Sequence, residues 1–184
     1  TVLPGRAPAA DTLVSLPPSG FYREPFAVSF PEGAGIRCGL GGKLPTENSP
    51  EIETLSIEKT TVIRCASFVP GKLSGEVVNR TYIFEDAPKV TAVFVTADPA
   101  SLFDPDSGIY EEGKFAQVVD PHYGANYWLD KEIPVFVELV EKGAAAPGFA
   151  KNAGLEIFGN YSRMNAKKSV AITFREKYGD KRLK

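Results

Sequence analysis

The 184-residue sequence lacks the features that mark several classes of protein. It has no apolar run close to the roughly 20 residues that cross a bilayer, so we predict no membrane span. Its 21 Lys and Arg against 23 Asp and Glu form no basic stripe, which argues against nucleic acid as a partner. The single histidine, His122, has no triad motif near it, and we predict a loop histidine without a catalytic role.

Cysteine is also scarce, with only Cys38 and Cys65 in the chain. Their spacing excludes the C-x-x-C arrangement of zinc and redox sites, and we predict no metal site. Two alternatives are open for the pair, a disulfide or two buried free thiols. Two cysteines are too few to define a cellular compartment.

Short apolar runs separated by turn residues fill the first half of the chain. Residues 1–19 are rich in proline and form a lead-in segment, with one edge strand expected near Thr12–Leu16. Runs of five to nine residues at this spacing predict an immunoglobulin-like β-sandwich over residues 20–85. The expected strands are Phe26–Phe30, Gly35–Leu40, Ile52–Ile57, Thr61–Phe68 and Glu76–Phe84.

The second half, residues 88–184, is also predicted to be β-rich with little helix. A buried strand is expected at Val90–Val95, followed by one helical turn with Asp98 as N-cap and Pro99 at its first position. Residues 105–126 form a long irregular stretch, of the kind that is often functional or mobile. Further strands are expected at Ile133–Val140, Gly154–Phe158 and Lys168–Arg175.

The acidic residues at the start of the irregular stretch invite a calcium-site interpretation. The spacing of Asp104, Asp106, Glu111 and Glu112 misses the EF-hand pattern, because Gly108 comes one place early and the bidentate Glu is absent. We therefore predict a turn that closes the short helix.

Residues 19–84 resemble the chitobiase/β-hexosaminidase C-terminal domain, a small immunoglobulin-like module. The segments that carry the resemblance are 19–22, 25–28, 33–38, 42–46, 59–66 and 74–82. The resemblance implies an accessory module of a secreted bacterial protein, often found beside carbohydrate-active domains. It also places Cys38 and Cys65 in the interior on neighbouring strands, without deciding whether they are bonded.

Residues 89–184 resemble the first half of a CotH-type (spore coat protein H) kinase domain. The densest match is Ala153 to Arg163 with Lys167-Lys168-Ser169, supported by 98–110, 126–128, 133–138 and 178–182. The resemblance implies a β-rich kinase-like amino-terminal lobe that is truncated, because the catalytic and metal-binding aspartates of such families lie further along. Both ends of the chain are likewise expected to be cuts in a longer polypeptide.

Together the two resemblances predict a non-catalytic fragment of an exported protein. The full-length parent would be an atypical ATP-dependent protein kinase, with ATP and magnesium as cofactors of the parent and none in this fragment. The remaining carboxyl-terminal half is the first expected partner, and a cell-surface protein or polysaccharide the second. The alternative is an extracellular or cell-surface scaffold, or a carbohydrate-associated binding module, with no catalysis.

The segment from Gly159 to Lys168 is the best candidate site. A glycine turn lets backbone N–H groups approach phosphate oxygens, and basic side chains supply charge. The nucleotide-binding candidates are Ser162, Arg163, Lys167 and Lys168. The sequence departs from the family pattern at Tyr161, a side chain large enough to crowd a phosphate. The alternative is an ordinary hairpin turn with solvated basic residues.

Overall fold

A computed structural model describes residues 15–69 and 72–179. Most of the strand expected near Thr12–Leu16 lies outside these residues. The prediction of a mostly β protein with little helix is confirmed, because strands dominate both halves of the described chain. No helix among the described residues is long and apolar enough to cross a membrane.

Contacts divide the chain into two compact units. The first contains Thr1–Thr91 together with Val140–Pro147, and the second contains Ala92–Leu139 together with Gly148–Lys184. Within the first unit, the Phe21 N–H donates to the Ala145 carbonyl at 2.9 Å. Gly20 lies so close to the same carbonyl that a Cβ at this position would be 2.5 Å from its oxygen. A glycine is therefore required where the chain passes the 140–147 segment.

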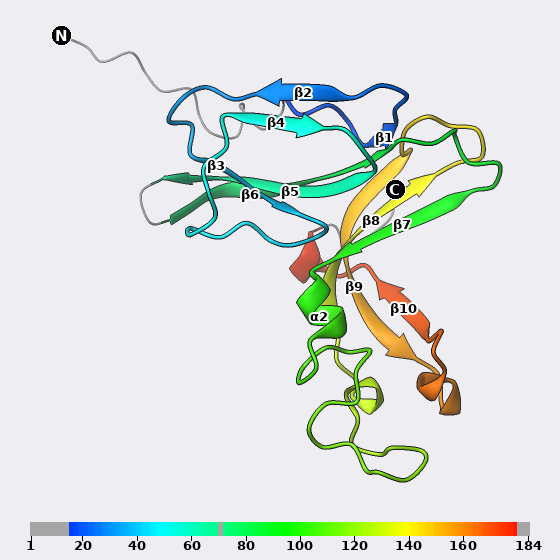
Figure 1. The fold of residues 1–184 in the computed structure, drawn as a ribbon. Helices are drawn as coiled ribbons and strands as arrows, with labels where there is room; N and C mark the ends of the chain where they lie inside the picture. The colour runs from blue at the N-terminus through cyan, green and yellow to red at the C-terminus, as the bar shows by residue number, and fades with distance from the viewer. Residues whose placement is uncertain (1–14, 70–71, 180–184) are drawn as a thin grey trace. The chain divides into compact units, whose positions relative to one another are not determined.

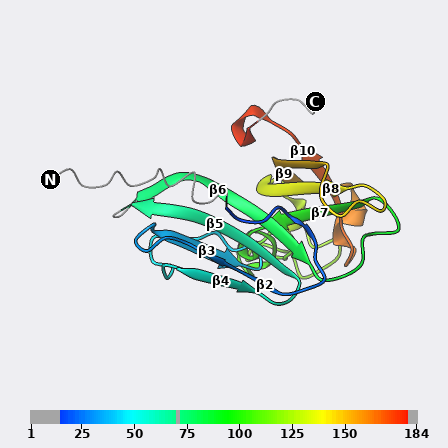
Figure 2. The ribbon, with the colours of Figure 1, turned by 90° about the horizontal axis from the view of Figure 1, so that it is seen from above.

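The first unit contains two sheets (Figures 1 and 2). The larger has the order β1-β6-β5-β3, from β1 (Gly20–Phe21), β3 (Ile36–Leu40), β5 (Thr61–Val69) and β6 (Lys72–Ile83). The smaller pairs β2 (Phe26–Ser29) with β4 (Thr54–Ile57). One buried core takes Val28 and Ile57 from the smaller sheet and Ile36, Ile63 and Tyr82 from the larger, which makes the unit a β-sandwich.

The two cysteines lie directly opposite one another in the β3–β5 pair. Their sulfurs form a disulfide with an S–S distance of 2.04 Å. Of the two alternatives that the sequence left open, the structure has the disulfide. Cys65 is fully buried, so the bridge belongs to the core of the sandwich.

The second unit is built on one sheet with the order β10-β9-β8-β7. Its strands are β7 (Ala92–Ala97), β8 (Ile133–Val140), β9 (Phe149–Phe158) and β10 (Ser169–Thr173). The helix α2 (Pro99–Phe103) and the 3₁₀ turns η1 (Asn126–Trp128) and η2 (Tyr161–Met164) lie between the strands, and the 3₁₀ turn η3 (Glu176–Tyr178) follows β10. The core comes mainly from one face of β8 and β9, with Ile133, Val135, Val137, Ala153, Leu155 and Ile157.

Two strand predictions for this unit need correction. The strand expected at Val90–Val95 runs from Ala92 to Ala97, and it is buried only at its last two residues, since Val93 is 54% and Val95 40% exposed. The exposed valines alternate with less exposed residues, so that one face of the strand is toward solvent. Strand β9 starts at Phe149 rather than Gly154, because the polar stretch before Gly154 still pairs with β8.

Candidate functional site

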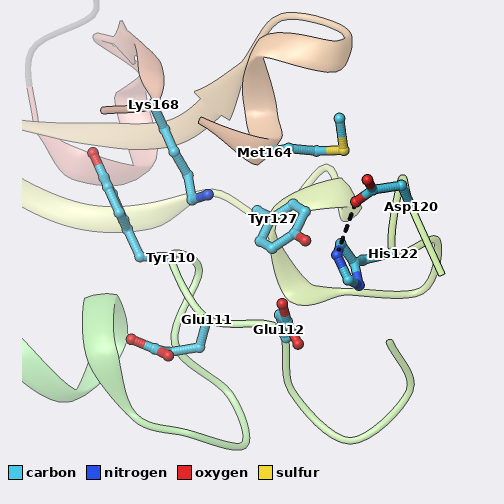
Figure 3. Close-up of a pocket in the computed structure, with 8 residues that line it drawn as sticks. All are labelled: Tyr110, Glu111, Glu112, Asp120, His122, Tyr127, Met164 and Lys168. Carbon is cyan, nitrogen blue, oxygen red and sulfur yellow. Dashed lines mark ion pairs between the residues drawn. The ribbon is translucent and has the colours of Figure 1, made fainter. Parts of the chain in front are cut away.

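A polar pocket of about 410 Å³ lies within the second unit (Figure 3). Its size falls in the range of small-molecule sites. The irregular stretch after α2 supplies most of its wall, and η2 and the residue before β10 supply the rest. The lining residues are Tyr110, Glu111, Glu112, Asp120, His122, Tyr127, Met164 and Lys168.

The irregular stretch is held in shape by local hydrogen bonds from polar side chains. The Asp98 carboxylate accepts from the Ala100 N–H and caps α2, with Pro99 at the first position, as predicted. The Asp104 carboxylate accepts from the Ser107 hydroxyl at 2.9 Å and from the Ser107 and Asp106 N–H groups. The Ser107 hydroxyl bond is the main cause that lowers the pKa of Asp104. Asp104 thus forms a turn after the helix, as the sequence predicts.

Asn126 connects the end of this irregular stretch to its beginning. Its side-chain amide is buried and donates to the carbonyls of Asp106 and Gly108, each at 3.1 Å. Gly113 has a φ of 71°, and a Cβ there would collide with the Asn126 amide. These contacts place Tyr110, Glu111 and Glu112 along one side of the pocket (Figure 3).

Lys168 enters the pocket from the opposite side (Figure 3). Its ammonium donates to the carbonyls of Arg163 at 2.7 Å and Asn165 at 3.3 Å, and it lies 4.1 Å from the centre of the Tyr127 ring. Burial lowers the pKa of Lys168, and the negative charges of Glu111 and Glu112 oppose that shift. Of the four predicted nucleotide-binding residues, Lys168 is the one that lines the pocket.

Arg163 does not line the pocket and instead forms hydrogen bonds to other parts of its own chain. Its guanidinium donates to the Gly159 carbonyl at 2.7 Å, to the Tyr127 carbonyl at 3.3 Å and to the Asp130 carboxylate at 3.1 Å. Only 13% of its side chain is exposed. These bonds tie η2 to the η1 region and occupy donors that a phosphate would otherwise use.

Ser162 and Lys167 also lie outside the pocket lining. Gly159 has a φ of 117°, and a Cβ there would lie 2.3 Å from the Ser162 hydroxyl oxygen, so the turn needs glycine. Lys167 is exposed. Tyr161 packs edge-on against Trp128, with ring centres 6.3 Å apart, and does not line the pocket. Whether Tyr161 would crowd a phosphate bound at the Gly159 turn stays a prediction.

His122 has contacts that its isolation in the sequence did not suggest. Its Nδ1 lies 2.9 Å from the Gln117 carbonyl oxygen, and its Nε2 lies 3.1 Å from an Asp120 carboxylate oxygen. Both ring nitrogens therefore lie within hydrogen-bonding distance of oxygen atoms. Burial raises the pKa of neighbouring Tyr127, with smaller contributions from the charges of Glu112 and Asp120. The pocket thus combines three carboxylates with one lysine, one histidine and two tyrosines.

No family model, curated protein or solved structure matches the chain. The two resemblances drawn from the sequence therefore stay predictions.

Proposed function

We propose that the second unit binds the phosphates of a magnesium-bound nucleotide, as the non-catalytic amino-terminal part of a CotH-type kinase-like protein. The observation that supports this most directly is the position of Lys168. It closely follows the segment that carries the densest family resemblance, and it lines the same pocket as Glu111 and Glu112, whose negative charges oppose the lowering of its pKa by burial. Kinases use a lysine opposite a glutamate to hold nucleotide phosphates.

The residues present fit a magnesium-bound phosphate better than a bare one. The Lys168 ammonium has three N–H groups, two of which donate to carbonyls, which leaves one for a phosphate oxygen. Protein-bound magnesium takes one or two carboxylates together with phosphates and waters. Among the described residues no three ligating side chains converge as a ready metal site, so one or two of the pocket carboxylates Glu111, Glu112 and Asp120 would bind the magnesium together with the phosphates. Bound magnesium neutralises phosphate charge beside carboxylates that would otherwise repel it.

Binding, rather than transfer, is the activity proposed for this chain. The aspartates that perform phosphoryl transfer in the resembled family follow the segment matched here. We also propose that the protein lies outside the cell or at its surface. The Cys38–Cys65 disulfide supports this location, because disulfides persist mainly in oxidising compartments.

A second candidate is a surface scaffold without catalysis, which docks a polysaccharide or a neighbouring domain. It is favoured by Arg163, whose guanidinium is engaged in bonds to its own chain. It is also favoured by the excess of carboxylates over Lys168 in the pocket lining.

A thermal-shift titration with Mg-ATP separates the two candidates. At 100 times the dissociation constant, a bound nucleotide adds about 2.7 kcal/mol to the free energy of unfolding, which is several degrees in Tm. Lys168→Met should abolish the shift. Lys167→Met is the matched control, because it removes the adjacent, exposed lysine and should leave the shift intact. ATP with a chelator, and magnesium alone, should each give little stabilisation.

Each outcome has a clear meaning. No shift in the wild-type chain, or an equal shift in both lysine variants, would refute nucleotide binding at this pocket and favour the scaffold. The comparison is valid where the unliganded variants keep the circular dichroism spectrum of the wild type.

A further inference from the structure

The irregular stretch of the second unit carries a loop with an apolar tip. This loop, residues 115–123, is called the apolar loop below, and it projects away from the sheet of its unit (Figure 1). Its three large apolar side chains are turned to solvent, with Phe115 83%, Val118 95% and Val119 68% exposed. Single exposed apolar residues are ordinary, whereas a contiguous apolar patch marks a contact with a protein or a membrane.

The apolar loop is held in shape by its own hydrogen bonds. The Gln117 N–H donates to the Tyr123 carbonyl at 2.9 Å and closes the loop, and the His122 N–H donates to the Val119 carbonyl at 2.8 Å. Bonded backbone groups are far less costly to bring near lipid than free ones. The loop therefore presents its apolar side chains on a preformed support.

Aromatic rings flank the base of the loop. Trp128 is half-buried, its indole N–H donates to the Pro121 carbonyl at 2.8 Å, and its ring centre lies 5.4 Å from that of Tyr123. Tyr123 is 48% exposed, and Tyr161, which packs against Trp128, is 58% exposed. Tryptophan and tyrosine are enriched where proteins meet the boundary between lipid and water, because each joins an apolar ring to a polar group.

We propose that the apolar loop inserts into the surface of a lipid bilayer, with the flanking tyrosine and tryptophan rings at the level of the headgroups. The tip, residues 115–119, contains no charged side chain. The charges on either side of it have partners, since Lys114 pairs with Asp106 at 2.8 Å and Asp120 lies 3.1 Å from His122. Insertion therefore needs no net charge on the lipid.

The area of the tip favours lipid over a protein partner. One phenylalanine and two valines offer on the order of 400 Å², whereas each side of a stable protein complex usually buries about 800 Å². The three side chains together hold about as many carbon atoms as a myristoyl chain, which by itself binds membranes weakly and reversibly. We therefore expect half of the protein to be bound at about 100 µM accessible lipid.

Co-sedimentation with phosphatidylcholine vesicles, from about 10 µM to 2 mM lipid, tests the proposal because this range brackets the expected value. Val118→Ser/Val119→Ser should weaken binding at least tenfold, since it removes methyl groups that enter the lipid. Val93→Ser/Val95→Ser is the matched control, because it makes the same change at exposed valines of β7 and should bind as the wild type does. Val118→Trp should tighten binding severalfold.

A second measurement locates the contact. Trp128 is the only tryptophan of the chain and is bonded to the apolar loop, so vesicles of brominated phosphatidylcholine should quench its fluorescence. The quenching should be lost in Val118→Ser/Val119→Ser and kept in Val93→Ser/Val95→Ser. The inference is independent of nucleotide binding, because Phe115, Val118 and Val119 do not line the pocket.

Four results would overturn the proposal. The first is a wild-type chain that stays unbound up to 2 mM lipid, well above the expected value of about 100 µM. The second is equal binding of the two double-serine variants. The third is binding only to anionic vesicles that salt abolishes, because this would show electrostatic adsorption. The fourth is self-association that Val118→Ser/Val119→Ser removes, without vesicle binding, because this would assign the loop to protein contacts.

Discussion

Removal of the Cys38–Cys65 disulfide is expected to destabilise the first unit by about 3.5 kcal/mol. The bridge joins cysteines 27 residues apart in the sequence. In the chain-entropy model, opening a loop of this length returns about 12 cal/mol/K of entropy to the unfolded chain. Because small domains are stable by only about 5 to 15 kcal/mol, the bridge accounts for a large part of the stability of this unit.

Two perturbations separate the loop effect from packing. Reduction of the wild-type chain opens the loop and keeps both sulfurs, so it should show the loop term. The double variant Cys38→Ala/Cys65→Ala also deletes a sulfur at a fully buried site, which should cost about 1 kcal/mol more. The variant is therefore expected to be less stable than the reduced wild type.

Chemical denaturation followed by circular dichroism measures the effect. For a domain of about 100 residues, 3.5 kcal/mol corresponds to a fall in Tm of about 15 to 25 °C. Trp128 is the only tryptophan and belongs to the second unit, so its fluorescence follows that unit separately. A loss below about 1 kcal/mol in both the reduced chain and the variant would refute the loop-entropy reasoning.

Two further predictions concern polar contacts of the second unit. The ion pair with Lys177 is the main cause that lowers the pKa of Glu132, so its carboxylate stabilises the fold above its ordinary pKa of 4.5 and loses this effect as pH falls through the lowered value. Glu132→Gln should therefore lower Tm at pH 7 but hardly at pH 2, and an equal loss at both would contradict the reasoning. Asn126→Ala should cost about 2 to 3 kcal/mol, because the carbonyls of Asp106 and Gly108 lose their donor. Urea denaturation followed by Trp128 fluorescence measures this cost, and a loss below about 0.5 kcal/mol would show that water replaces the amide.

Local signals in the sequence predicted several elements well. Asp98 and Pro99 start α2 where expected, because capping depends on neighbouring residues only. The alternating run Ile133–Val140 forms β8 with the predicted bounds. The burial of β7 was predicted wrongly, since an apolar run does not show whether its strand lies at the centre or the edge of a sheet. The bonding of Cys38 and Cys65 depends on strand register, which local patterns do not give.

Most residues that line the pocket could not be predicted from sequence patterns. The sequence singled out Lys168, but Tyr110, Asp120, His122 and Tyr127 lie in a stretch without periodicity. Their positions depend on a buried amide, that of Asn126, bonded to carbonyls 18 and 20 residues away. The signals of a site there were the length of the irregular stretch and its acidic residues, of which Glu111 and Glu112 line the pocket.

Under the proposed function, the different contacts of Arg163 and Lys168 favour a magnesium-bound phosphate over a bare one. A guanidinium has five N–H groups in a rigid fork, and Arg163 donates through each of its three nitrogens to Gly159, Tyr127 and Asp130. Lys168 is left as the lysine that lines the pocket with the carboxylates. A bare phosphate would meet one lysine and three carboxylates, whereas a magnesium-bound phosphate carries the cation that those carboxylates prefer. Dependence on magnesium is therefore the property by which the nucleotide proposal stands or fails.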